Sequence, residues 1–466
     1  MADKKTDALR EKLTFKPRNA FFGEFDLSLA DSFAEEYKSF INVGKTGRLC
    51  VKETVAIAEK AGFVPFTRGM KLSSGDKVYK ICHGKAIVFA VIGKKSLADG
   101  VNIAAAHIDV PCLDLKQMPL YESEGLALFK THYYGGIKKY QWPAIPLALY
   151  GVVVKKNGET CELAIGDDAN DPVFTITDLR PHLAKDQMVK KAGELFTGEN
   201  LNVLCGSRPV PGAEETETDA VKLNVLRLLN EKYGIIEEDF LSAELTVVPA
   251  FSARDVGFDR SLIGAYGHDD RVCSYPALRA ICDMETPDKT SICMLADKEE
   301  IGSEGISGMQ SSFFDTFVED LCDTQDVPLR VCFENSACLS ADVAVAMDPN
   351  YPEVHEKQNT AYLNRGIALC KFTGSRGKYD SNDATAEMIA KLRSLFDSAD
   401  VYWQMCELGK VDQGGGGTVA MYMSKRNIET IDAGVPVLGM HSPFEVVAKN
   451  DVYMAYRAMS AFFTNY

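Results

Sequence analysis

The stretch VNIAAAHIDVP, residues 101–111, decides the fold class, together with KAIVFAVIG at 85–93 and TSICMLADKEEIG at 290–302. Each contains a short apolar run of the kind found in strands that are buried on both faces. Helical patterns separate such runs. In YPALRAICDM, for example, Pro276 is expected just inside the start of a helix. Strands that alternate with helices predict an α/β domain.

The pattern changes at about residue 113. LDLKQMPLYESEGLALFKTHYYGG and YGVVVKKNGETCELAIG alternate apolar and polar residues around turn signals such as Asn157-Gly158, which is typical of antiparallel strands. The α/β pattern returns beyond residue 255. We therefore expect an α/β domain built from residues 1–112 and 249–466 and interrupted by a β-rich insertion at 113–248.

Composition limits the partners and the compartment. The chain has 466 residues and a formal net charge of −15. Such a surface repels nucleic acid and anionic membranes, so neither is expected as a partner. The N-terminus MADKKTDALREKLTF lacks the apolar region of a secretory signal. The 13 cysteines are odd in number and never spaced as CxxC. Reduced thiols and a cytoplasmic location are the expectation.

Metal-capable side chains follow the predicted strands. In open α/β sheets, ligands bind beyond the carboxyl ends of the strands. The chain has only seven histidines, and two of them come directly after apolar runs. The five places are His107 with Asp109, Asp269 with Asp270, Glu299 with Glu300, Asp342, and His441.

Two of these candidates, at residues 107–109 and 299–300, combine a possible metal ligand with a neighbouring carboxylate. His107 and Asp109 would face the same side of an extended segment, so Asp109 could fix the ring tautomer that binds metal. Glu299 and Glu300 would point in different directions, so one could bind metal while the other takes a proton from water. The alternatives are a strand-end histidine capped by an aspartate, and an ordinary acidic loop.

The other candidates complete a possible two-metal centre. One carboxylate of the Asp269–Asp270 pair could bridge two cations, although the pair could also cap a helix. Asp342 could cap a turn, and His441 could be a core histidine. Taken together, two histidines, a bridging aspartate, two further carboxylates and a free glutamate provide two metal sites and a base. Two divalent ions are expected, zinc first, with cobalt or manganese as substitutes.

Six motifs, in this order along the whole chain, resemble the M18 family of metallo-aminopeptidases, particularly its bacterial branch. They are AAHIDVP, SLIGAYGHDDR, DKEEIGSEG, SADVAVAMDPNY, GGGGT and GMHSPFE. The resemblance implies that a metal-bridging hydroxide attacks the first peptide carbonyl of substrates with free N-termini. It also implies the roles: His107, Asp269 and Asp342 hold one metal, Asp269, Glu300 and His441 hold the other, Glu299 is the general base, and Asp109 supports the site.

The family's architecture is a second implication. Its catalytic domain is a mixed-sheet α/β/α sandwich that a β-rich dimerisation domain interrupts. Dimers commonly assemble into a tetrahedral dodecamer. His182, in TITDLRPHLAKD, matches a catalytic histidine that reaches the neighbouring subunit's site in relatives. A surface histidine is the alternative.

The preferred first residue of the substrate stays open between acidic, basic and neutral. Lys371 aligns with a lysine near the side-chain pocket of acidic-specific members, although a solvated lysine is the alternative. The segment GGIKKYQW at 135–142 departs from the pattern of those members. Gly416 and Thr418 belong to a glycine-rich stretch that could bind a carboxylate through backbone N–H groups, or could be a flexible turn.

Two other functions compete with the aminopeptidase. A deacetylase or other amidohydrolase could use a similar two-metal scaffold. A catalytically silent assembly protein could keep the fold, although such a protein would be free to lose Glu299 or a histidine, and here both are present.

Overall fold

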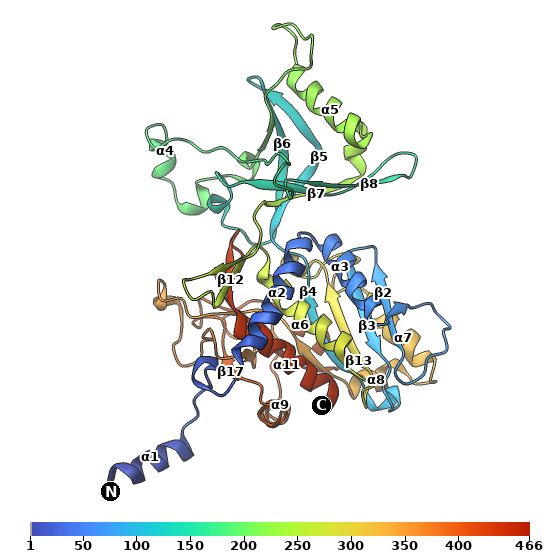
Figure 1. Ribbon diagram of the computed structural model, residues 1–466, viewed down its shortest axis with the longest axis vertical. Coiled ribbons are helices and arrows are strands. Elements are labelled where there is room, and N and C mark those ends of the chain that lie inside the picture. The colour runs from blue at the N-terminus through green and yellow to red at the C-terminus, as the bar shows by residue number, and fades with distance from the viewer. Residues whose placement is uncertain (1) are drawn as a thin grey trace.

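The computed structural model describes residues 2–466, which form three β-sheets with helices packed around them (Figure 1). The largest sheet has nine strands in the order β1-β2-β3-β13-β4-β14-β18-β16-β17. The four central strands, from β13 to β18, run parallel, and antiparallel pairs with β3 and β16 flank them. The nine strands are β1 (Val64–Pro65), β2 (Lys77–Cys82), β3 (Ala86–Val91), β4 (Asn102–His107), β13 (Ser291–Ala296), β14 (Ala337–Ser340), β16 (Ile367–Cys370), β17 (Trp403–Cys406) and β18 (Glu429–Gly434).

The apolar stretches predicted as buried strands are β3, β4 and β13 of this sheet. In β4, Ala104 and Ala106 belong to one hydrophobic cluster, while Ile103 and Ala105 belong to a second. Successive side chains of a strand point to opposite faces, so β4 contributes to a core on each side. This explains why its sequence is continuously apolar rather than alternating.

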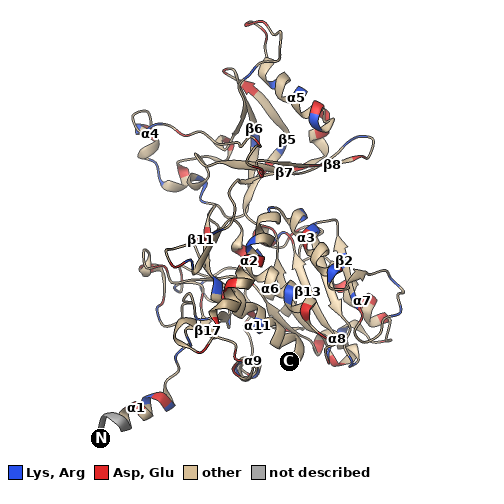
Figure 2. Cartoon of the chain, viewed as in Figure 1, with Lys and Arg blue, Asp and Glu red and all other residues tan. Residues whose placement is uncertain are grey.

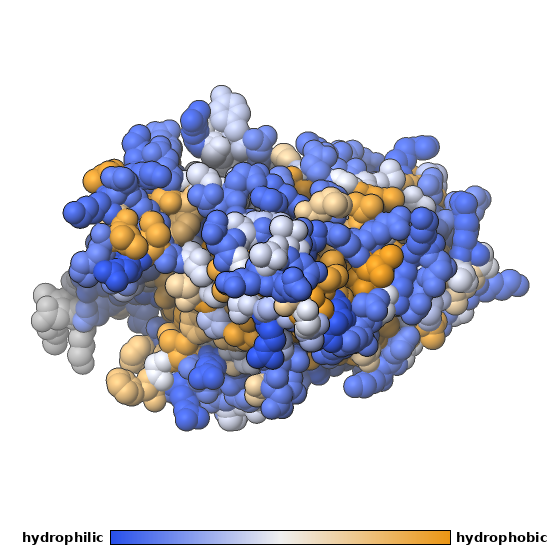
Figure 3. All heavy atoms as spheres, turned by 90° about the horizontal axis from the view of Figure 1, so that it is seen from above, coloured by the Kyte–Doolittle hydropathy of each residue, from blue (hydrophilic) through white to orange (hydrophobic). Residues whose placement is uncertain are grey.

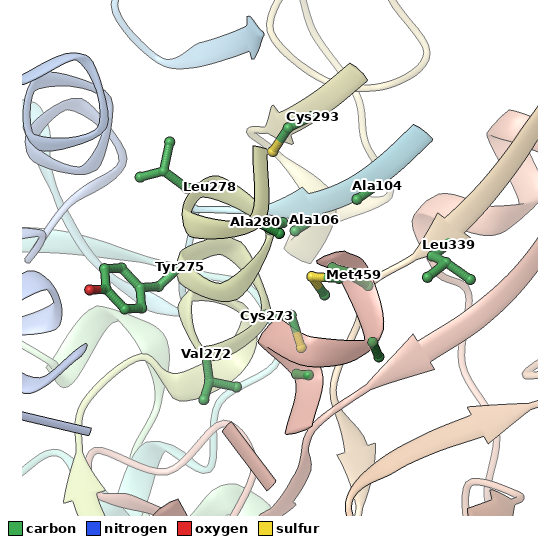
Figure 4. Packing of buried hydrophobic residues seen from close by; sticks show 14 of the residues in the cluster. Ala104, Ala106, Val272, Cys273, Tyr275, Leu278, Ala280, Cys293, Leu339 and Met459 are labelled. Atoms are coloured by element: carbon green, nitrogen blue, oxygen red, sulfur yellow. The ribbon is translucent and has the colours of Figure 1, made fainter. Parts of the chain in front are cut away.

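Helices cover both faces of the sheet, which confirms the predicted mixed-sheet α/β fold. Figure 4 shows Ala280 of one helix next to Ala106 and Ala104 of β4, with Met459 of another helix close by. The first cluster takes in α2 (Leu27–Val43), α3 (Gly47–Lys60), α6 (His268–Asp283), α9 (Ala386–Ser398) and α11 (Lys449–Asn465). The second takes in α7 (Phe313–Asp323), α8 (Leu329–Glu334) and α10 (Val419–Ser424).

Two local predictions were wrong. The helix expected to start beside Pro276 starts earlier: α6 is bounded at His268, after a turn at Gly267 whose φ is 81°, and becomes regular only after Asp269 and Asp270, whose backbone angles are not helical. Pro276 therefore lies inside α6. The strand expected at 340–349 is broken: β14 ends at Ser340, and β15 (Ala344–Val345) belongs to another sheet. Asp342 and Val343 lie between the two strands, whereas the backbone N–H of Ala341 still donates to the carbonyl of Ala105 in β4 at 2.6 Å.

A six-stranded sheet, in the order β8-β7-β10-β5-β6-β9, lies above the large sheet in Figure 1. All of its pairings are antiparallel, as the alternating sequence predicted. Its strands are β5 (Cys112–Ser123), β6 (Leu126–Tyr134), β7 (Leu147–Val154), β8 (Thr160–Ile165), β9 (Val203–Gly206) and β10 (Ala243–Pro249), and it is accompanied by α4 (Lys185–Met188) and α5 (Ala220–Tyr233). We refer to residues 112–249 as the upper sheet region.

The third sheet has five strands in the order β11-β12-β20-β19-β15. These are β11 (Arg254–Val256), β12 (Leu262–Ala265), β15, β19 (Pro436–Leu438) and β20 (Glu445–Ala448). The remaining helices are α1 (Ala2–Leu13), η1 (Ala20–Phe22), η2 (Leu97–Asp99), η3 (Lys139–Gln141), η4 (Ala192–Glu194), η5 (Gly198–Asn200), η6 (Glu237–Ser242), η7 (Glu299–Ile301) and η8 (Pro352–Val354).

Charged residues of both signs are spread over the large and upper parts of the molecule (Figure 2). Among residues 2–466, the helices are all too short or too polar to cross a bilayer. Eleven of the thirteen cysteines are buried and the other two are half-buried, and all thirteen are free thiols. Most of them therefore act as small core side chains.

Candidate metal centre

The carboxyl ends of three parallel strands bring the predicted residues together. His107 is the last residue of β4, and its partner in the β13 ladder is Ala296. Glu299 and Glu300 follow β13 within the short helix η7, and Asp342 follows β14. Adjacent parallel strands end at the same edge of a sheet, so residues from distant parts of the sequence become neighbours there.

Asp269 lies at the centre of this group. Its Oδ1 is 3.2 Å from Nε2 of His107, and its Oδ2 is 3.2 Å from Nε2 of His441. Only 3% of Asp269 is exposed. One buried carboxylate thus faces two imidazole nitrogens with its two oxygens, which is the arrangement expected of a bridging ligand.

Three more carboxylates surround the two imidazoles. Oε2 of Glu300 lies 3.5 Å from Nε2 of His441. Oε2 of Glu299 and Oδ1 of Asp342 lie 3.8 Å and 4.0 Å from Nε2 of His107. We call His107, Asp269, Glu299, Glu300, Asp342 and His441 the carboxylate–histidine cluster.

Two groups of side chains, drawn from this cluster and from Asp270, have ligand atoms close enough to hold a metal ion. One is His107, Asp269 and Glu300, and the other is His107, Asp270 and Asp342; in each, the atoms lie within 4.8 Å of one another. Both overlap the predicted ligand sets without matching them, since Asp270 takes part and His441 does not. The Asp270 carboxylate is also fixed by a hydrogen bond, because its Oδ2 accepts the backbone N–H of His107 at 3.2 Å.

The charge balance of the cluster also suits cations. Burial raises the pKa of Glu299 to about 7 and raises the pKa values of Glu300 and Asp342. Burial alone would lower the pKa of His441. The hydrogen bond to Asp269 and the negative charge of Glu300 outweigh this effect and raise the pKa to about 10. The imidazoles thus hold protons that offset the carboxylates, and divalent cations can replace those protons.

Unsatisfied oxygen atoms in the cluster and in the adjacent Asp270 fit the same interpretation. Oε1 of Glu300 and Oδ1 of Asp270 are buried without a hydrogen-bond partner. An unpartnered buried acceptor is costly, and metal coordination is one way to satisfy it. The nitrogen and oxygen donors present are those that zinc takes in proteins, and cobalt or manganese accepts a similar set.

Asp109 lies beside the cluster and contacts several of its members. Its two carboxylate oxygens accept the backbone N–H groups of Glu299 and Glu300, each at 3.1 Å, and Oδ2 also accepts the hydroxyl of Tyr134 at 2.6 Å. Nδ1 of His107 lies 3.3 Å from its Oδ1. Burial opposes ionisation, but the hydrogen bonds from His107 and Tyr134 lower the pKa of Asp109 overall.

Sequence reasoning missed three groups that support the cluster. Tyr134 comes from β6 of the upper sheet region. The carbonyl of Gly136, just beyond that strand, lies 2.8 Å from Nδ1 of His441. Glu445 accepts the backbone N–H groups of His441 and Asp269. For Glu445, the sequence offered one signal, its position at the end of the motif GMHSPFE. The roles of Tyr134 and Gly136 depend on tertiary packing and have no signal in the sequence.

A cavity of about 470 Å³ opens onto the cluster. This volume lies within the usual range for small-molecule sites. Gly416 and Thr418 are among its lining residues, as are the four apolar side chains Val343, Val345, Leu408 and Met440. Among the described residues, the ionisable groups that line this cavity are carboxylates, a histidine and a tyrosine. The cavity is therefore partly apolar and partly acidic.

Two predicted residues lie apart from the cluster. The Lys371 side chain is 45% exposed, and its Nζ lies 3.9 Å from Oδ1 of Asp383. Lys371 is absent from the residues that line the cavity. His182 is exposed and precedes α4 in the upper sheet region. Among residues 2–466, no hydrogen bond or ion pair joins His182 to the cluster of the same chain.

Comparison with known proteins gives consistent matches over nearly the whole chain. A family model described as aminopeptidase I zinc metalloprotease (M18) matches residues 40–463. The chain is 49% identical over 458 residues to a Clostridium acetobutylicum protein named probable M18 family aminopeptidase 1, which covers 96% of this chain and 98% of that protein.

Solved structures agree. The crystal structure of an M18 family aminopeptidase from Thermotoga maritima has a TM-score of 0.93 at 45% identity, and covers 97% of this chain and 100% of that one. The structure of an S. cerevisiae mApe1 dodecamer shares the fold, with a TM-score of 0.75 at 23% identity over 93% of this chain and 96% of that one.

Proposed function

Because this chain belongs to the M18 family of aminopeptidases, we propose that the carboxylate–histidine cluster is its active site. The chain is a metallo-aminopeptidase, and neither a deacetylase nor a silent assembly protein is favoured by its relatives. The observation that carries the proposal is Asp269, whose two oxygens each lie 3.2 Å from a different imidazole nitrogen.

The family is described as one of zinc metalloproteases, and the donor set fits two divalent ions, zinc first. We propose His107, Asp269 and Asp342 as one ligand set, and Asp269, Glu300 and His441 as the other. The short distances from Asp269 to both imidazoles support a shared ligand. When bound, such ions supply Lewis acidity that polarises the scissile carbonyl and acidifies water.

The protein side of the mechanism rests on Glu299. Its carboxylate would take a proton from the attacking water and pass it to the leaving amino group. A pKa raised to about 7 by burial matches both halves of this task near neutral pH. Asp109 would fix the positions of Glu299 and Glu300 by accepting their backbone N–H groups, and would keep the His107 ring in one orientation.

The cavity next to the cluster would bind the first residue of the peptide. Gly416 and Thr418 would contact the substrate. The carboxylates attract the free α-amino group, whereas an acidic side chain would meet repulsion and no lysine or arginine in the lining. Since Lys371 is exposed and near Asp383, we propose that the enzyme favours non-acidic first residues.

Assembly and location are also proposals. Residues 113–248 would form a dimerisation domain, and 1–112 with 249–466 the catalytic domain. Exposed apolar side chains flank His182, namely Leu179, Leu183, Met188 and Val189, and Figure 3 shows hydrophobic patches on the face seen from above. Dimers would build a tetrahedral dodecamer in which His182 reaches a neighbouring copy's site. The thirteen free thiols support a cytoplasmic location.

A substrate panel tests the function. The zinc-loaded protein is given peptides that begin with Leu, Lys, Ala, Asp or Glu, each with a free and with an acetylated N-terminus. We expect release of the first residue from the free forms only, and least from the peptides that begin with Asp or Glu. Cleavage confined to the acetylated forms would instead establish an amidohydrolase. A preference for Asp or Glu would contradict the interpretation of the cavity.

A further inference from the structure

Glu445 is a buried carboxylate that the mechanism above does not use. It is the first residue of β20 and is 1% exposed. Its Oε1 accepts the backbone N–H of His441 at 2.7 Å, and its Oε2 accepts the backbone N–H of Asp269 at 3.1 Å. Among the ion pairs of residues 2–466, none pairs Glu445 with a lysine or an arginine.

Burying a carboxylate without a cationic partner is costly, so the two amide hydrogen bonds must offset much of that cost. Both amides belong to cluster residues that come from different parts of the chain. Asp269 follows β12 through the turn at Gly267, and His441 lies in the connection between β19 and β20. Glu445 pairs with Ala265 in the β12–β20 ladder, so its side chain lies where the two segments leave the sheet.

The two segments carry side chains that must meet. Nε2 of His441 lies 3.2 Å from Oδ2 of Asp269, and each of these side chains is attached to a backbone position that Glu445 holds. A shift of either amide would change that distance directly. Asp109 makes the equivalent arrangement on the other side of the cluster, with the amides of Glu299 and Glu300.

We propose that Glu445 is a positioning residue that holds Asp269 and His441 as one unit and so sets the affinity of the metal site they share. The inference rests on the proposed function in that it takes both residues as metal ligands. The chemistry requires a carboxylate of this length. Glutamine has one acceptor oxygen, and its NH₂ group would face an amide N–H. Aspartate is one methylene shorter and cannot reach both amides from the same backbone position.

The test compares Glu445→Gln with Asp451→Asn in the full-length chain. Asp451 is a matched control because it is also fully buried and accepts two backbone amides, those of Asn364 and Gly366, each at 2.7 Å. Zinc affinity is measured by competition with a chromophoric chelator at fixed pH, and thermal unfolding of the metal-free protein is recorded in parallel.

We expect Glu445→Gln to weaken the lower-affinity zinc site by about 10–100-fold, the usual cost of losing a residue that orients a metal ligand. Excess zinc should then restore part of kcat. Asp451→Asn should lower thermal stability and leave zinc affinity unchanged. If Glu445→Gln does not fold, Glu445→Asp serves instead, with the same loss of affinity expected.

Wild-type zinc affinity in the Glu445 variant that folds would overturn the inference, as would equal losses of affinity in Glu445→Gln and Asp451→Asn. Failure of the proposed function has a different signature. A wild-type chain that binds zinc but cleaves no peptide contradicts the aminopeptidase mechanism and leaves the comparison of zinc affinities intact.

Discussion

Replacing Glu299 with glutamine should separate metal binding from catalysis. Glu299 Oε2 lies 3.8 Å from Nε2 of His107, outside direct hydrogen-bond distance, while the backbone N–H of Glu299 is held by Asp109. Because the substitution changes only the side-chain head group, the loop should keep its position. The variant should also lose a charge that burial already disfavours, so its stability should match or slightly exceed that of the wild type.

The expected catalytic loss follows from the assigned role. A positioned general base typically contributes 10²–10⁴-fold to the rate, which corresponds to about 3–5 kcal/mol in the activation free energy. Glu299→Gln should therefore lower kcat/KM by that factor while the zinc content, measured by atomic absorption, stays at the wild-type level. Glu304→Gln is the matched control, because Glu304 is exposed and follows in the same loop.

Two results would refute the reasoning. A Glu299→Gln variant that is fully loaded with zinc and hydrolyses peptides within tenfold of the wild-type rate cannot have lost the general base. A variant that loses its zinc would show instead that Glu299 is a ligand, and the roles of Glu299 and Glu300 would have to be reassigned.

Two further predictions follow from the hydrogen bonds and protons of the cluster. Tyr134→Phe removes the hydroxyl that donates to Asp109 at 2.6 Å. It should lower the free energy of unfolding by about 1.5–3 kcal/mol, whereas the exposed Tyr133→Phe should change it by less than about 0.5 kcal/mol in the same urea titration. Zinc affinity should fall as the pH is lowered from 8 to 6, because the pKa values of both cluster histidines are raised and zinc must displace their protons. For each proton that zinc displaces, the affinity should fall about tenfold for each unit by which the pH is lowered. The affinity is measured by chelator competition. An affinity that stays constant over this range would contradict the assignment of both imidazoles as ligands.

The sequence was informative about the sheet edge because two simple patterns coincide there. Continuous apolar runs identify β4 and β13 as strands buried on both faces, and the polar residue that ends each run is conspicuous. His107 ends the first run directly. Asp297 and Lys298 separate the second run from the Glu299–Glu300 pair, so there the pattern indicated a polar loop and the paired carboxylates drew attention to themselves. The proximity of His107 to this pair then follows from the parallel pairing of the strands, which the α/β rhythm already suggested.

Other features could not be read in this way. Pro276 suggested a helix start, yet regular helix already begins just after Asp270, beyond the turn at Gly267, and neither the turn nor the two non-helical aspartates give an amphipathic signal. Residues 340–349 look like one strand because their apolar alternation continues across Asp342, although the chain changes sheets at that point. Glu445 was not singled out as a site residue, because its role is to join the nearby amide of His441 to that of Asp269, which is 176 residues away in sequence.

The upper sheet region takes part in the site as well as lying beside it. Tyr134 donates its hydroxyl to Asp109, and the carbonyl of Gly136 lies 2.8 Å from Nδ1 of His441. A carbonyl oxygen can only accept, so Nδ1 carries a proton in this contact, and Nε2, which faces Asp269, is the nitrogen that would bind a metal once its own proton is displaced. Any movement of this region relative to the large sheet would disturb both hydrogen bonds at once. A rearrangement of the upper sheet region on self-association would therefore act on the orientation of His441 and on the support of Asp109, even without a residue from a second copy entering the site.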